Sequence, residues 1–141
     1  MSMTLAERAA ATEKVIIKFR EKPFDWRHAA TCVHLARAQI VAMGGKVPPI
    51  PRFQSPLAAK RSLRKLGHKS VLELLDSVLE GQRIPPAAMI VGDIGLLPGE
   101  DGLDAVVIAA GHKVIGWHGS DLSRLQVIEV NRGDLIAAWR L

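Results

Sequence analysis

The chain has 141 residues, of which 48% are hydrophobic, and its formal net charge at pH 7 is +5. A chain of this length can fold as one domain around one hydrophobic core, and it has no apolar run long enough to span a membrane. The N-terminus lacks the basic and apolar regions of a signal peptide. The single cysteine excludes an internal disulfide, which is typical of a protein made in a reducing cytoplasm.

The positive charge leaves the class of partner open. A value of +5 is ordinary for a soluble domain, and it would also attract an anionic surface. Aromatic residues make up only 4% of the chain and tyrosine is absent, which argues against a surface that stacks on bases. The sequence contains no helix-turn-helix, zinc-finger or basic-zipper pattern. We therefore do not expect nucleic acid as a partner.

The first predicted helix spans residues 5–21. Thr4 and Glu7 have the spacing of a capping box, in which each residue's side chain accepts a hydrogen bond from the other's backbone N–H. Pro23 ends the helix. Its predicted apolar stripe consists of Ala9, Thr12, Glu13, Ile16, Ile17 and Arg20.

The second predicted helix carries the only cysteine. Thr31 is a suitable N-cap, Cys32 lies in the first turn, and Gly44-Gly45 ends the helix. Backbone N–H groups and the helix dipole favour a thiolate at this position. The face predicted to be buried consists of Cys32, Leu35, Ala36, Gln39, Ile40 and Met43. Residues 46–53, which include three prolines, are predicted to form an extended connection.

The third predicted helix begins at Ser55-Pro56 and ends at Gly67. It carries most of the densest basic stretch of the chain, formed by Lys60, Arg61, Arg64, Lys65, His68 and Lys69. Such a stretch is either a solvated face or a docking surface for an acidic partner or a cell-wall polymer. Its predicted buried side consists of Leu57, Leu63 and Leu66.

The fourth predicted helix begins with a second capping box, Ser70 to Glu73, and Gly81 follows its end. We expect one face to contain Leu72, Leu75, Val78 and Leu79. After Pro85-Pro86 the pattern changes to short strands at residues 89–97, 103–110, 113–117, 125–130 and 137–141, with a tight hairpin turn at Gly111-His112. Helices followed by strands predict an α+β domain with a small antiparallel sheet.

Several short motifs occur in an informative order: residues 23–26, Cys32, Gly67-His68 with Ser70, residues 84–86, Gly92-Asp93 and residues 138–140. In this order the chain resembles the papain-like cell-wall peptidases of the NlpC type. It is similar, more closely still, to a family of small phage-encoded proteins found among tail genes. The resemblance covers residues 4–141 and implies one papain-like domain over residues 1–141.

The resemblance also implies a set of site residues. In the peptidases a cysteine attacks a peptide carbonyl of peptidoglycan, a histidine on a following strand is the base, and a loop tyrosine helps to bind the oxyanion. Cys32 matches the nucleophile and Trp26 the loop tryptophan, but Phe24 stands at the tyrosine position and Asp104 at the base position. A carboxylate of ordinary pKa is a poor base for a thiol. Phe24, Trp26 and Asp93 are the predicted substrate-binding residues.

Other histidines are candidates to replace the missing base. His118 follows a predicted strand and is the better substitute if the strand alignment shifts, whereas His28 lies in the loop before Cys32. A packed or surface role is the alternative for each histidine, as an inert buried thiol is for the cysteine. His28, Cys32 and His34 lack the spacing of a zinc site, so we expect neither a metal nor a cofactor.

The resulting functional hypothesis is a structural or accessory protein of the phage or prophage tail tip, with a peptidoglycan-hydrolase-like fold and a degenerate active site. It would be made in the bacterial cytoplasm and assembled into the virion. Its partners would be other tail-tip proteins, such as distal tail or hub subunits, with peptidoglycan as a further possible one. The alternative is an active cysteine endopeptidase or amidase that helps the tail to cross the cell wall.

Overall fold

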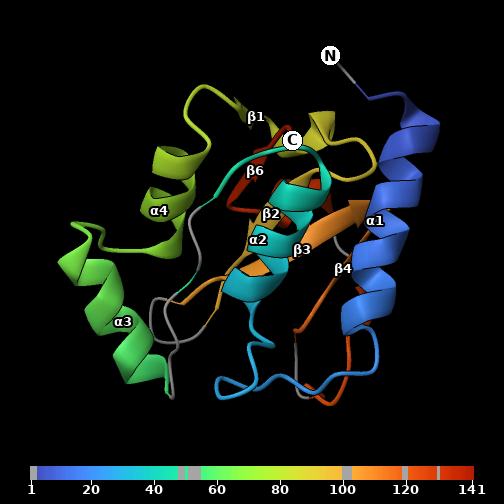
Figure 1. The fold of residues 1–141 in the computed structure, drawn as a ribbon. Helices are drawn as coiled ribbons and strands as arrows, with labels where there is room; N and C mark the ends of the chain where they lie inside the picture. The colour runs from blue at the N-terminus through green and yellow to red at the C-terminus, as the bar shows by residue number, and fades with distance from the viewer. Residues whose placement is uncertain (1–2, 48–49, 51–54, 100–102, 119–120, 130) are drawn as a thin grey trace.

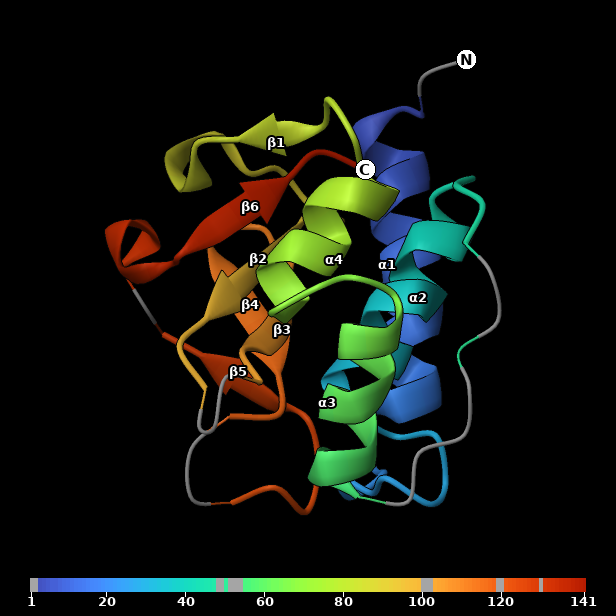
Figure 2. The same cartoon turned by 90° about the vertical axis from the view of Figure 1, so that its left-hand side faces the viewer.

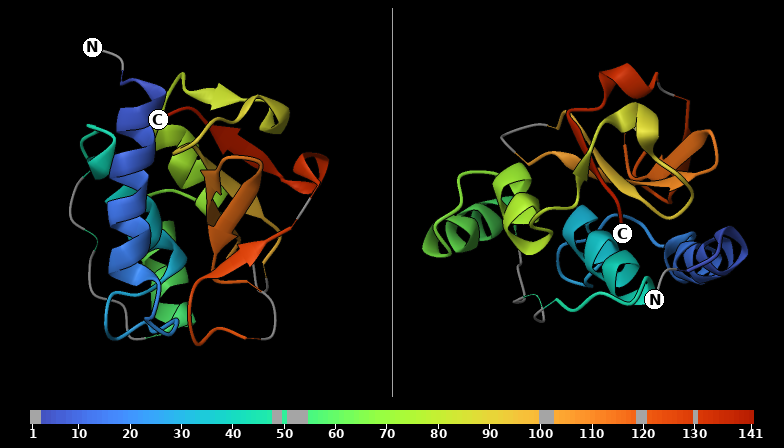
Figure 3. Two further views of the ribbon diagram at one scale, coloured as in Figure 1. Left: turned by 90° about the vertical axis from the view of Figure 1, so that its right-hand side faces the viewer. Right: turned by 90° about the horizontal axis from the view of Figure 1, so that it is seen from above.

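The computed structural model describes residues 3–47, 50, 55–99, 103–118, 121–129 and 131–141. Within them, four α-helices pack against a six-stranded antiparallel sheet, which confirms the predicted α+β class. Figure 1 shows the helices on one side of the sheet, and the view from above in Figure 3 separates the two layers. No helix among these residues is both long enough and apolar enough to cross a membrane.

The helices begin where the sequence predicts. They are α1 (Leu5–Phe19), α2 (Cys32–Ala42), α3 (Pro56–Lys65) and α4 (Val71–Val78). The side chains of Thr4, Thr31, Ser55 and Ser70 each accept a hydrogen bond from a backbone N–H in the first turn of their helix, as N-caps do. The capping box of α1 is complete. In α4, Glu73 accepts instead from the N–H of Lys69.

The buried face of α1 differs from the predicted stripe. Its buried residues are Arg8, Thr12, Val15 and Phe19, whereas Ile17 is 55% exposed. Of the predicted stripe only Thr12 is fully buried. The predicted stripe left out Arg8, whose side chain is buried because it donates to the distant, buried Asp93.

The third helix also exposes residues that were predicted to be buried. Leu57 is 58% exposed and Leu66 is 64% exposed, while Ala59 and Leu63 are buried. In α4 the buried residues are Val71 and Leu75, and Leu79 follows them. Figure 2 shows α3 and α4 stacked end to end on one side of the molecule, so they form an outer wall beside α2.

The sheet has the strand order β1-β6-β2-β3-β4-β5, and all neighbouring strands are antiparallel. Its strands are β1 (Arg83–Ile84), β2 (Ile94–Leu97), β3 (Ala105–Ala110), β4 (Lys113–Gly116), β5 (Gln126–Ile128) and β6 (Ala137–Trp139). The short 3-10 helices η1 (Pro86–Ala88) and η2 (Arg132–Asp134) lie between strands. In the β3–β4 hairpin Ala110 pairs with Lys113, and Gly111 has a φ of 73°, which confirms the predicted turn.

Three strand predictions need correction. The strand expected at 89–97 begins only at Ile94, because residues 90–93 form a turn in which the N–H of Asp93 donates to the carbonyl of Ile90 at 3.1 Å. Strand β1 was not predicted at all. The segment at 137–141 is a strand only over Ala137–Trp139. Val130, and the prolines at 48, 49 and 51, lie outside the described residues.

Both faces of the sheet are buried along its inner strands β2 and β3. Along β3, Val106 and Ile108 contact the helices, whereas Val107 and Ala109 belong to a second apolar cluster on the opposite face. That second cluster also includes Met89 and Leu135 and the strand residues Leu97, Ala105, Val114 and Ala138. Burial on both faces explains why β2 and β3 are continuous apolar runs rather than alternating ones.

Candidate functional site

Cys32 is the first residue of α2, as predicted, but its thiol is not poised for reaction. The residue is partly exposed, while its sulfur is enclosed and packs against apolar side chains from both core clusters. Burial raises the pKa of the Cys32 thiol to about 11, although hydrogen bonds from the backbone of Val106 and of Cys32 itself favour the thiolate. The thiol is therefore protonated at neutral pH.

This result contradicts the expectation that the helix N-terminus would favour a thiolate at Cys32. The helix start and its N-cap are present. However, loss of solvation around the sulfur has a larger effect on the pKa than the nearby backbone amides. The position on the helix and the orientation of Cys32 toward the packed side were predicted from local sequence, but the strand residues that enclose its sulfur, such as Val106, were not.

No histidine is among the groups that act on the Cys32 thiol in the described chain. The side chain of His28 is 79% exposed, and its Nδ1 lies 2.5 Å from Oδ2 of Asp25. His118 is half-buried directly after Trp117. His34 has its Nδ1 2.7 Å from Oγ1 of Thr31, and burial together with Arg37 lowers the pKa of its imidazole.

Asp104, at the position where the resemblance implies the base, holds a turn. Its Oδ1 accepts a hydrogen bond from the N–H of Gly99 at 3.1 Å, across the β2–β3 connection. It lies two residues before Val106, whose backbone contacts the thiol. The structure thus brings this part of the chain close to Cys32, but the carboxylate of Asp104 is not among the groups that shift the pKa of the thiol.

Phe24 and Trp26, two predicted substrate-binding residues, belong to an aromatic cluster. The ring centroids of Phe24 and Trp26 are 5.5 Å apart, and those of Phe24 and Trp117 are 5.8 Å apart, in edge-to-face arrangements. Trp117 also packs on Phe19 and donates from Nε1 to the carbonyl of Lys22 at 3.0 Å. This packing gives Phe24 and Trp26 a structural role. Their role in substrate binding remains a prediction.

Asp93, the third predicted substrate-binding residue, is fully buried. Its Oδ1 accepts from Nη2 of Arg8 at 2.6 Å and from the N–H of Leu141 at 3.1 Å. Its Oδ2 accepts from Nε of Arg140 at 2.8 Å and from the N–H of Ile90 at 2.9 Å. All its lone pairs are directed at protein donors, so this carboxylate is not accessible to a substrate.

We call Arg8, Asp93 and Arg140, with the backbone of Leu141, the Asp93 cluster. Arg8 also donates to the carbonyl of Val91 at 2.8 Å and to that of Leu141 at 2.6 Å. Arg140 donates to the carbonyl of Ala88 at 2.6 Å. Sequence reasoning missed this cluster. The available signal was an arginine in a helix facing the core, because a buried cation requires a buried acidic partner.

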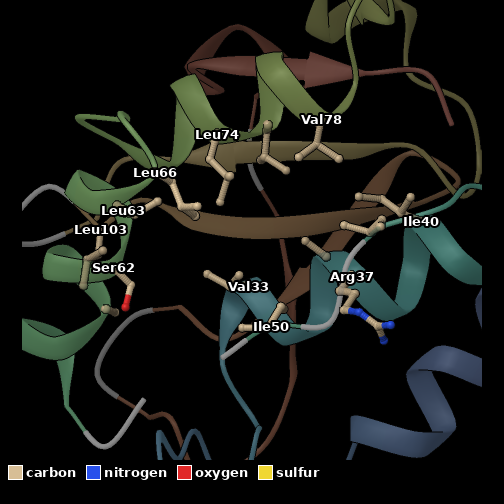
Figure 4. A pocket seen from close by; sticks show the side chains of 14 residues that line it. Val33, Arg37, Ile40, Ile50, Ser62, Leu63, Leu66, Leu74, Val78 and Leu103 are labelled. Carbon is tan, nitrogen blue, oxygen red and sulfur yellow. The ribbon is translucent and has the colours of Figure 1, made fainter. Parts of the chain in front are cut away.

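An apolar pocket with a volume of about 130 Å³ lies between α2, α3 and α4. Figure 4 shows leucine and valine side chains from all three helices pointing into it, with Arg37 at one end and Ser62 on the α3 side. Cys32 does not line this pocket. The sequence did not predict this pocket, because its presence depends on how α3 and α4 are packed relative to α2.

A family described as a domain of unknown function (DUF6950) matches residues 3–141, and the chain belongs to this family. No curated protein and no solved structure matches the chain. The family description assigns no activity, so function has to be argued from the chain's own residues.

Proposed function

We propose that this protein is a structural or accessory component of a phage or prophage tail tip, built on a papain-like scaffold of the NlpC type that no longer catalyses hydrolysis. The phage context derives from the resemblance of the sequence motifs. The layout of the chain supports the scaffold: a helix that begins with a cysteine packs on an antiparallel sheet, and the thiol lies against β3.

The loss of activity rests on one observation, the environment of the Cys32 sulfur. A cysteine hydrolase needs a thiolate and an imidazole to transfer its proton. Here burial raises the pKa of the thiol to about 11, and no histidine of the described chain acts on it. Phe24 offers no hydroxyl to an oxyanion, and Asp104 is engaged with a turn. The scaffold would then serve assembly rather than cleavage, with distal tail or hub subunits as its partners.

The alternative, an active cysteine endopeptidase or amidase, is favoured by one feature. Asp25 and His28 form a hydrogen-bonded carboxylate–imidazole pair four residues before Cys32, and such a pair orients an imidazole. Activity would require this loop to close over α2 and the thiol to become accessible. The backbone pairing of Asp25 with Ala30 holds the loop in its present form.

Two measurements test the proposal. Purified virions of the encoding phage should contain the protein at the tail tip by mass spectrometry and immuno-electron microscopy. Virions that carry Cys32→Ala should infect as well as the parent does. Absence of the protein from purified particles would contradict the tail role.

Hydrolysis is tested separately with purified peptidoglycan. We expect the protein, Cys32→Ala and His28→Ala to release peptides equally, at the level of the blank. Release by the parent that is lost in Cys32→Ala would establish the alternative, and loss in His28→Ala as well would identify the base.

A further inference from the structure

The pocket between α2, α3 and α4 is lined almost wholly by carbon. Its described walls are apolar residues of three helices and two connecting segments, and among these described residues only Arg37 and Ser62 contribute polar side chains. Leu66 stands at its α3 side and is 64% exposed, so apolar surface continues from the pocket onto the outside of the molecule. An apolar hollow that continues onto exposed apolar surface is typical of an interaction site.

The pocket volume limits what can enter. A cavity of about 150 Å³ accommodates one benzene molecule, so about 130 Å³ is enough for one large side chain such as phenylalanine or leucine. It is too small for a drug-sized ligand or a folded element. The pocket therefore fits a single anchor residue. In many protein interfaces, a few such anchor residues supply most of the binding free energy.

The charges around the pocket indicate the residues that should flank that anchor. The sequence of α3 contains four basic residues and no acidic one. Lys60 and Lys65 lie on either side of its pocket-lining stripe, by helical spacing from Leu63 and Ser62. Arg37 lines the pocket from α2.

The opposite wall carries fewer acidic residues than α3 carries basic ones, since the acidic residues of α4 are Glu73 and Asp76. On α4, Asp76 accepts from Nε1 of Trp139 at 3.0 Å and pairs with Arg83 at 3.4 Å. Glu73 accepts from the backbone of Lys69 at the start of the helix. Basic residues therefore outnumber acidic ones on the two helices that form these walls, and this excess complements an acidic chain.

We propose that this pocket is a docking site for an acidic segment of another protein, which inserts one large apolar side chain while its carboxylates face the α3 lysines. The site is separate from Cys32. The inference goes beyond the proposed tail role and does not depend on it.

The test is an NMR titration of the full isotope-labelled chain with three synthetic peptides. The first carries one phenylalanine among glutamates and alanines, the second replaces that phenylalanine by alanine, and the third replaces the glutamates by lysines. We expect only the first to bind, with shifts concentrated at amides of the pocket-lining residues, and with affinity that falls as salt rises. No binding of the first peptide, or equal binding of the first and third, would overturn the proposal.

Protein variants locate the site. Ser62→Leu fills the pocket and should weaken binding by about tenfold, whereas Ser77→Leu, the same change on α4 outside the pocket, should not. Should Ser62→Leu fail to fold, Leu66→Ala at the exposed rim replaces it, with about a threefold loss expected. The proposal fails if neither pocket variant lowers affinity.

Charge variants and oligomeric state complete the design. Lys60→Gln with Lys65→Gln should weaken binding and flatten its salt dependence, and Lys14→Gln with Lys18→Gln, on the exposed side of α1, should change neither. Sedimentation of the chain alone should show a monomer. A dimer that Ser62→Leu dissociates would show that a second copy occupies the pocket, which would contradict an acidic partner.

Discussion

Asp93 and Cys32 are both packed against β3, yet their surroundings are opposite in kind. Asp93 is buried with two guanidinium groups and two backbone N–H groups directed at its carboxylate, and its own carbonyl accepts from Ala109 of β3. Cys32 lies against Val106 of the same strand, among apolar side chains, and burial raises the pKa of its thiol. One environment maintains a charge in the interior, and the other suppresses a charge.

Reactivity therefore does not follow from residue type and local position alone. The cysteine at a helix N-terminus has the sequence context of a nucleophile, but residues of distant strands exclude water from its sulfur. The aspartate after a glycine has the sequence context of a turn, but distant arginines make it the main ionic centre of the fold.

The largest effect is expected from Asp93→Ala. It leaves two arginines without their buried partner, and removal of one member of a buried ion pair costs about 3–5 kcal/mol. Urea unfolding should show this loss. The control is Glu129→Ala, which removes an exposed carboxylate 3.1 Å from Lys113 and should change stability by less than about 0.5 kcal/mol. Similar losses for the two variants would contradict the distinction between buried and exposed pairs.

The turn that presents Asp93 should be the next most sensitive. Gly92 has a φ of 94°, and an added Cβ would lie 2.7 Å from Cε of Met43 and 3.0 Å from Oγ1 of Thr12. We expect Gly92→Ala to lose about 2–4 kcal/mol through strain and overpacking. Gly81 has a similar φ of 78° with open space around it, so Gly81→Ala should lose only about 1 kcal/mol. Thermal unfolding of the two variants separates backbone strain from steric contact.

Cys32 should respond to alkaline pH. Because folding raises the pKa of the thiol from 9.0 to about 11, the stability that the protonated form contributes is fully present below pH 9 and is lost as the pH rises through 11. The stability difference between the parent and Cys32→Ala should therefore narrow over this range. At pH 8, iodoacetamide should alkylate the folded chain about 100-fold more slowly than the urea-unfolded chain. Equal alkylation rates would show an accessible thiolate.

The smallest effect is expected at His34. Burial and the positive charge of Arg37 lower the pKa of its imidazole below 6.5. The neutral ring therefore favours the folded state at pH 7, and this contribution declines as the pH falls below 6.5 toward the lowered pKa. NMR titration should give His34 a midpoint below 6.5, and Arg37→Gln should shift that midpoint upward. An unchanged midpoint in the variant would exclude Arg37 as a cause.

Local features of the fold could be predicted from the sequence, and distant pairings could not. The four helix starts followed from Thr4, Thr31, Ser55 and Ser70, because a cap depends on residues three positions away. The buried face of α1 was missed because the partner of Arg8 is 85 positions distant. Strand β1 was missed because two residues carry no periodicity.

The same distinction between predictable local features and unpredictable distant contacts applies to the candidate site. The position of Cys32 at the start of α2, on the buried face of the helix, was predictable, but the contacts with β3 that enclose its sulfur were not encoded in any local pattern. The accessibility of Asp93 was misjudged because Arg8 and Arg140 lie near opposite ends of the sequence. The α2–α3–α4 pocket depends on helix packing angles, which the apolar stripe of each helix does not determine.

The Asp93 cluster also imposes an order on biosynthesis. Arg8 and the carbonyl that it binds at Leu141 are 133 positions apart. On the ribosome, α1 therefore emerges long before the segment that neutralises and encloses its arginine. Until then the helix must either remain undocked or place a cation against an unfinished sheet. Completion of the contacts of Arg8 should consequently be among the last steps of folding during translation.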